Sequence, residues 1–159
     1  MPIIEVYLPE SALDDGRREA LHERISRAAL EGEGLSWESD LARSLTWVLI
    51  QEMPRGTFST GGQRLGDADR PRVLVRVTVA VGAATDDSRA AIAAGINHAL
   101  VATLGEEFSD PRKSMCVIEE QPVAGGANIV SYPDLRRILA DLSAQPAPDG
   151  GGQGQRRTA

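Results

Sequence analysis

A duplication constrains the fold of this 159-residue chain more than any other feature of its sequence. The stretch WVLIQEMP from Trp47 aligns with MCVIEEQP from Met115, and DDGR at Asp14 aligns with DDSR at Asp86. Around both pairs of matches, strand-like, helix-like and strand-like segments follow one another. A repeat of roughly seventy residues is too long for a solenoid unit, so it indicates a tandem pair of βαβ modules.

The first module is predicted to hold a strand over 2–8, a helix over about 16–30 and a strand over 45–53. The segment PIIEVYL is apolar and β-branched, and the turn after it offers Asp14 or Asp15 as the helix N-cap. The polar stretch EGEGLSWESD then ends the helix. An apolar stripe at helical spacing supports this helix: Leu21, Ile25, Ala28 and Ala29.

The second module opens with the clearest period-two pattern in the chain, which predicts a strand over 73–81. Thr85, Asp86 and Asp87 are the candidate N-caps of the following helix. Its apolar stripe comprises Ile92, Ile96, Ala99, Leu100 and Thr103. After the polar segment GEEFSDPRK, the segment MCVIEE is the fourth strand.

These elements predict an α+β fold with the order β-α-β-β-α-β, in which two helices cover one face of a four-stranded sheet. We expect modules over 2–59 and 73–142, joined by a connection over 60–72. The Gly- and Pro-rich segment 143–159 is predicted to be a disordered tail.

Two helices leave the other face of the sheet uncovered. That face carries either Ile4, Val6 and Leu8 or Ile3 and Tyr7, and an apolar face of this kind needs a partner. The sequence therefore predicts an oligomer.

Composition and charge limit the kinds of partner and the cellular compartment that we expect for this protein. The apolar fraction of 42% is ordinary for a globular domain, and the net charge of −6 argues against nucleic acid. The single cysteine, Cys116, the absence of a signal-peptide pattern and the absence of a membrane-length apolar run favour a cytoplasmic protein without a membrane partner.

Pro2 is the candidate catalytic residue. Removal of Met1 would leave Pro2 with a free secondary amine, and an N-terminal amine has a pKa of about 7.7–8.0. Burial in an apolar pocket disfavours the ammonium form and lowers that pKa toward the range of a general base.

The N-terminal proline on a strand, the βαβ modules and the segment SLTWVLIQEMPRGTFSTGGQ from Ser44 together resemble the tautomerase superfamily. The similarity is to the 4-oxalocrotonate tautomerase group, in a fused two-module form, and it covers roughly residues 2–140. The resemblance implies a tautomerase/MIF-like fold and a homotrimer of fused chains. It also implies that Pro2 is the base, and the second module has Leu74 at the matching position.

The same resemblance implies an apolar pocket around the amine. The family's aromatic pocket residue maps onto Phe58, and its apolar wall positions map onto Met53 and Leu8. Each of these has a plain alternative, because Met53 and Leu8 also suit a core and Phe58 also suits a hairpin plug.

The chain departs from the family at the two substrate-binding arginines. The first position falls near Ala12 or Leu13 and the second falls at Trp47, which favours a smaller or more apolar enol acid over a dicarboxylate. Trp47 then belongs to the substrate pocket. The candidate carboxylate anchors are Arg76, Arg43 and Arg55. Arg76 is the first choice, with an ion pair to a residue such as Glu5 as its alternative role.

No metal site or cofactor motif is predicted, because His22 and His98 lack further ligands at metal spacing. The leading hypothesis is therefore a cofactor-independent keto-enol tautomerase that acts on a 2-hydroxyenoate or enolpyruvate-type acid. Two alternatives stay open: hydration or hydrolytic dehalogenation of an unsaturated acid by protonated Pro2, and a catalytically silent oligomeric scaffold.

Overall fold

The computed structural model describes residues 2–54, 56–64, 72–121 and 137. Contacts along the chain separate residues 1–125 from residues 126–159, and everything described below lies in the first unit. The predicted tail over 143–159 and part of the predicted connection lie outside the described residues.

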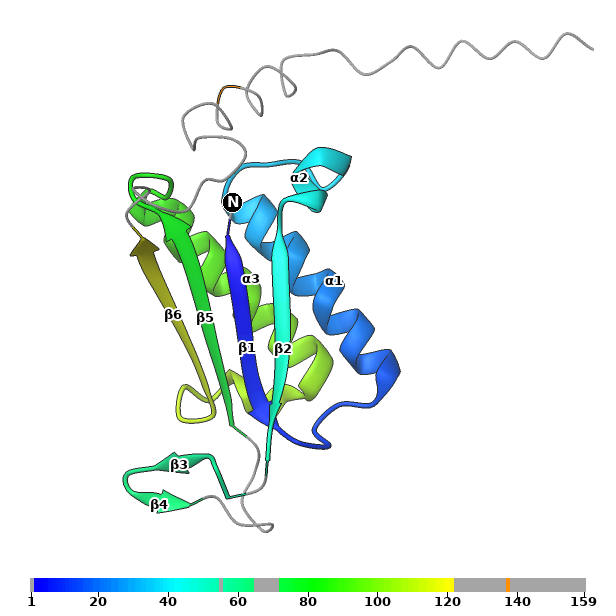
Figure 1. Cartoon of the computed structure of the whole chain (residues 1–159), viewed down its shortest axis with the longest axis vertical. Coiled ribbons are helices and arrows are strands. Elements are labelled where there is room, and N and C mark those ends of the chain that lie inside the picture. The colour runs from blue at the N-terminus through cyan, green and yellow to red at the C-terminus, as the bar shows by residue number, and fades with distance from the viewer. Residues whose placement is uncertain (1, 55, 65–71, 122–136, 138–159) are drawn as a thin grey trace, which may run out of the picture. The chain divides into compact units, whose positions relative to one another are not determined.

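The order strand-helix-strand occurs twice, which confirms the α+β class and the tandem βαβ arrangement (Figure 1). The principal elements are β1 (Ile3–Pro9), α1 (Asp15–Gly32), β2 (Trp47–Met53), β5 (Val73–Ala80), α3 (Asp86–Leu104) and β6 (Ser114–Gln121). The strands form one sheet in the order β2-β1-β5-β6. Pairing is parallel within each module, as a helical crossover requires, and antiparallel between β1 and β5, where the modules meet.

Each long helix begins at a side-chain N-cap. The Asp14 carboxylate accepts a hydrogen bond from the Arg17 N–H, and the Thr85 hydroxyl accepts one from the Ser88 N–H. The equivalent N-caps are thus Asp14 and Thr85, whereas the alignment of DDGR with DDSR matched Asp14 with Asp86. The true spacing between the modules is therefore one residue shorter than the alignment implied. With this offset, Val73 rather than Leu74 is the counterpart of Pro2.

The core lies between the sheet and the two helices, which pack on the same face (Figure 1). Alternate residues of β1 and β5 are buried there: Ile4, Val6, Leu8, Val73, Val75, Val77 and Val79. The alternative that the sequence left open is therefore settled, and Ile3, Glu5 and Tyr7 lie on the uncovered face. We call this uncovered side of the sheet the open face.

The structure contains short elements that the sequence patterns did not reveal. A five-residue helix, α2 (Asp40–Ser44), begins inside the stretch expected to be a break, so the following strand starts at Trp47 rather than residue 45. A 3-10 turn, η1 (Glu106–Ser109), lies in the second break, and β3 (Ser59–Thr60) pairs with β4 (Gln63–Arg64) as a small hairpin. Elements this short leave no periodic signal.

Close packing of α1 on α3 depends on two glycines. A Cβ atom at Gly95 would lie 2.9 Å from the Cβ of Ala28. At Gly32 it would lie 2.5 Å from Ile92 Cγ1 and 2.9 Å from the Ile92 backbone nitrogen. Backbone cannot move aside as a flexible side chain can, so Gly32 is the more restrictive contact.

Gly32→Ala is expected to lower the free energy of unfolding by about 1–3 kcal/mol, because overpacking outweighs the gain in helix propensity. Gly16→Ala is the matched control, since its added Cβ meets only the Asp14 carboxylate at 3.6 Å. Urea unfolding of both variants measures the difference. Equal or higher stability of Gly32→Ala would contradict the close contact.

Candidate active site

Pro2 lies where β1 begins, and it is buried in the full chain. Ile3, the next residue, pairs with Trp47 of β2 on one side and with Thr78 of β5 on the other. Pro2 therefore directly precedes the point where β1 begins to pair with both neighbouring strands. The Trp47 N–H donates a hydrogen bond of 3.4 Å to the Pro2 carbonyl oxygen. This bond fixes the backbone of Pro2 against the start of β2.

Helix α2 leads directly into this junction. The Thr46 hydroxyl donates to the Ala42 carbonyl at 3.0 Å, which ties the end of α2 to the residue before Trp47. Arg43 of α2 forms an ion pair with Asp40, and its guanidinium lies 5.5 Å from the centre of the Trp37 ring. Arg43 and Trp47 are therefore the two predicted pocket residues that the fold places at the same end of the sheet as Pro2.

Three other predicted pocket residues lie elsewhere. Met53 pairs with Pro9 at the far end of β1, and Phe58 follows Met53 by five residues, just before β3. Seven strand residues at about 3.3 Å each separate this end from Pro2 by roughly 20 Å. Leu8 is fully buried in the core beneath the helices, and Arg55 lies outside the described residues.

Arg76 lies at the middle of the open face, on the side of the sheet away from the helices, as its alternation with the buried valines predicted. One guanidinium nitrogen donates to Glu119 Oε2 at 2.7 Å, and another lies 3.9 Å from Glu5 Oε2. The hydrogen bond and charge of Glu119 are the main causes that raise the pKa of Arg76. This arrangement matches the ion-pair alternative for Arg76, because its guanidinium is already engaged by carboxylates.

Glu52 is a structurally important residue whose partners the sequence analysis missed. Its carboxylate accepts hydrogen bonds from Arg18 and from the Ser11 N–H, the latter at 3.2 Å. Ser11 has a φ of 64°, a left-handed conformation that is unfavourable for a residue other than glycine. Glu52 therefore holds the strained turn between β1 and α1.

The second module repeats this contact, because Arg89 of α3 donates to Glu120 of β6 as Arg18 of α1 donates to Glu52 of β2. The alignment of Glu52 with Glu120 was the available signal. Each arginine also pairs with an acid in the first turn of its own helix, Arg18 with Asp15 and Arg89 with Asp86.

The hydrogen bond from the Ser11 N–H lowers the pKa of Glu52 below its ordinary value, and the hydrogen bond from Arg18 makes the second-largest contribution. A lowered pKa stabilises the fold at neutral pH, and this contribution is lost as the pH falls through that pKa. Glu52→Gln is therefore expected to lower the free energy of unfolding by about 1 kcal/mol at pH 7. The loss should be much smaller in acid, below the pKa values of Glu52 in the folded and the unfolded chain.

Thermal unfolding of both proteins across the acid range measures this effect. Glu23→Gln is the control, because Glu23 forms an exposed pair with Arg27 on α1 alone. A Glu52→Gln penalty that stays constant into acid would contradict the assignment.

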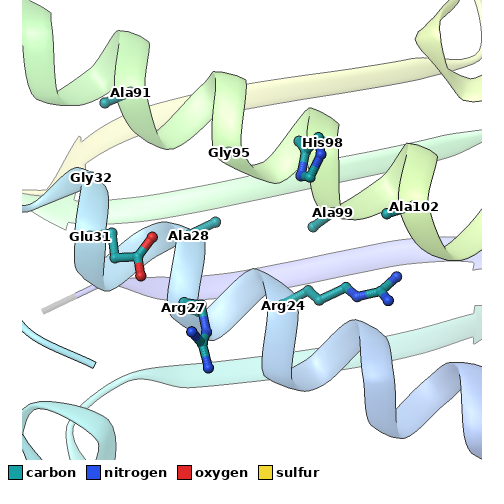
Figure 2. Close-up of a pocket in the computed structure, with 10 residues that line it drawn as sticks. All are labelled: Arg24, Arg27, Ala28, Glu31, Gly32, Ala91, Gly95, His98, Ala99 and Ala102. Carbon is teal, nitrogen blue, oxygen red and sulfur yellow. The ribbon is translucent and has the colours of Figure 1, made fainter. Parts of the chain in front are cut away.

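A groove lies between α1 and α3, and Pro2 is not among the residues that line it (Figure 2). It has a volume of about 460 Å³, and small residues such as Ala28, Gly95 and Ala99 line it. Two arginines at its rim, Arg24 and Arg27, donate to Thr103 and Glu23. Nothing in this groove indicates a ligand.

Neither the cysteine thiol nor a group of metal-ligating side chains forms a second reactive site in the described residues. Burial raises the pKa of the Cys116 thiol to about 11, so it is not a nucleophile at neutral pH. Within the described ranges, no three His, Cys, Asp or Glu side chains gather as a possible metal site. No helix in that part of the chain combines the length and the apolar character needed to span a bilayer.

Comparison with known proteins identifies the fold. No protein-family model and no curated protein matches the sequence. Solved structures match nearly the whole architecture. A native fused 4-OT has a TM-score of 0.69 at 22% identity and covers 85% of this chain and 99% of its own.

Two further structures extend this similarity. A fused 4-OT described as an asymmetric trimer has a TM-score of 0.67 at 19% identity, covering 84% of this chain and 98% of its own. A member of the cis-3-chloroacrylic acid dehalogenase family has a TM-score of 0.65 at 16% identity, covering 90% and 92%. The resemblance to the 4-oxalocrotonate tautomerase group is thus confirmed in the fold, including its fused two-module form.

Proposed function

We propose that the protein is a cofactor-independent keto-enol tautomerase that acts on a 2-hydroxyenoate or enolpyruvate-type acid. The observation that carries the proposal is the position of Pro2, buried at the start of the first strand of a fused 4-OT fold. Val73, the counterpart of Pro2 in the second module, lies within the chain and offers no such amine, so we infer one site per chain.

The chemistry that we propose needs only the Pro2 nitrogen. After Met1 is removed, this nitrogen is a secondary amine whose neutral form is favoured by burial. It takes the proton from the substrate's 2-hydroxyl, and the oxygen electron pair released forms the carbonyl as the C=C bond opens. The electron pair of that C=C bond takes the proton back from the ammonium at the distal carbon, so a C–H bond forms and the amine is regenerated.

The substrate carboxylate needs a cationic partner. We infer that Arg43 takes this role in preference to Arg76, because α2 leads into the strand that binds the Pro2 backbone. Among the described residues, Arg43 forms an ion pair only with Asp40, an exposed neighbour on the same short helix, whereas carboxylates from two adjacent strands engage Arg76. Arg55 stays a candidate outside the described residues. Trp47 beside Pro2 favours an apolar substituent on the substrate over a second carboxylate.

We infer that the pocket is completed by a second chain. Pro2 and Phe58 belong to opposite ends of the same strand pair, so a Phe58 that shields the amine must come from a neighbouring chain. The proteins described as fused 4-OT trimers provide the precedent for a homotrimer. The apolar side chains on the open face support such an assembly.

Pro2→Ala is expected to lower turnover by about 10²–10⁴-fold, because the ring that fixes the base is lost, while the oligomer persists. Ketonisation of phenylenolpyruvate and of 2-hydroxymuconate, followed by ultraviolet absorbance on protein whose mass shows Met1 removed, measures the effect. Higher turnover of phenylenolpyruvate is expected from Trp47.

The matched control is a chain that retains one residue ahead of Pro2, which converts the amine into a non-basic amide. It should be inactive yet assembled. Full activity of either protein would contradict the role of Pro2, and a clear preference for 2-hydroxymuconate would contradict the substrate class.

A mixing experiment tests the two-chain pocket. Pro2→Ala and Phe58→Ala chains should each be impaired alone, and random mixed trimers should regain roughly a quarter of the wild-type activity, since each mixed trimer rebuilds one complete site. Dissociation and reassembly of each variant alone is the control. No recovery in the mixture would place Pro2 and Phe58 in separate roles or in one chain.

The alternative of hydration or dehalogenation needs a carboxylate that activates water. Glu5 is the carboxylate nearest to Pro2 in the sequence. The Tyr7 hydroxyl donates to one Glu5 oxygen at 3.0 Å, and Arg76 lies 3.9 Å from the other. These contacts favour an ion-pair role for Glu5 over the activation of water.

A further inference from the structure

The open face carries most of the large apolar side chains that the described residues expose. Trp47 is 62% exposed, Met115 60%, Ile3 44% and Leu49 41%. All four alternate with core residues on their strands, so they lie on the side of the sheet that no described helix covers. Large apolar side chains gathered on one exposed face are typical of a protein contact.

A charged network lies in the middle of this apolar face. Arg76 pairs in register with Glu5 across β1 and β5, and it donates to Glu119 on β6. The Tyr7 hydroxyl donates to Glu5, which closes the group on its other side. We call Glu5, Tyr7, Arg76 and Glu119 the open-face network.

The network is closed within one chain but unbalanced in charge. Two carboxylates face a single guanidinium, and β2, the remaining strand, adds only uncharged side chains to this face: Trp47, Leu49, Gln51 and Met53. If water reaches the network, its ion pairs contribute little, because solvent screens exposed pairs. If another protein surface covers it, each carboxylate needs Arg76, since an unpaired buried charge is strongly unfavourable.

We propose that the open-face network is buried inside a contact with a second copy of this chain and that Arg76 is the residue on which this contact depends. The occupant is a second copy because similar fused proteins are described as trimers, and because the pocket proposed above takes Phe58 from another chain. The inference rests on the assembly invoked in the proposed function, but not on the reaction.

The experiment is a charge-removal series measured by sedimentation over a range of concentrations. Arg76→Met should weaken assembly by about a hundredfold or more, because it strands two carboxylates in the contact. The triple replacement Glu5→Gln, Arg76→Met and Glu119→Gln should restore assembly to near the wild-type level, since neutral groups of similar volume replace the whole network.

Arg112→Met is the matched control. It removes an arginine that is 83% exposed and paired with Asp110 on a surface turn, so assembly should not change. Circular dichroism of each variant confirms that the monomer is folded. Recovery by the triple variant distinguishes a buried network from a chain that simply misfolds.

Each outcome decides the proposal. Unchanged assembly in Arg76→Met overturns it, and a simultaneous loss of turnover would instead make Arg76 a substrate anchor. A wild-type chain that stays monomeric also overturns it, whatever its activity. Dissociation by Arg76→Met with rescue by the triple variant supports it, even if no enol acid is turned over.

Discussion

The sheet is buried on one side only, and the rest of the structure depends on that constraint. Alternate residues of β1 and β5 form a row of Ile, Val and Leu side chains against α1 and α3. Because side chains in a strand alternate, the same burial fixes which residues reach the open face. Trp47, Arg76 and Met115 lie there for this reason alone, whatever their chemistry.

The two modules share a side-chain helix N-cap and an arginine–glutamate contact, and they differ at the position of Pro2. Each has an N-capped helix whose first turn carries an arginine bonded to a glutamate of the module's second strand. The shared contacts explain why the repeat survives at these positions. Pro2, the proposed base, belongs to the first module, and the second module supplies the two strands that complete the sheet.

Much of the fold could be predicted from local patterns. Period-two alternation in the segment beginning at Val73 and helical spacing after Asp14 and Thr85 predicted the six principal elements. The short helix α2, the η1 turn and the hairpin strands gave no periodic signal. The offset between modules was misjudged by one residue, because DDGR and DDSR look alike although a different residue caps each helix.

The candidate site was less predictable than the fold. The sequence named Pro2, Trp47 and Arg43 as separate candidates, and the pairing of β1 with β2 brings them to one end of the sheet. The same register separates Met53 and Phe58 from Pro2, because β2 runs parallel to β1 and ends at its far end. Leu8 lies in the core, on the side of the sheet that the helices cover. The engagement of Arg76 with Glu119 was also hidden, since the two residues are 43 positions apart.

The sequence by itself determined the repeated βαβ order, the helix caps and the proline at position 2, because these depend on neighbouring residues in the chain. Only the tertiary structure decided which face of β1 is buried, which ends of the strands lie together and which carboxylates engage Arg76. Those outcomes depend on the pairing of distant strands, and a shift of one residue in that pairing reverses the face of every side chain.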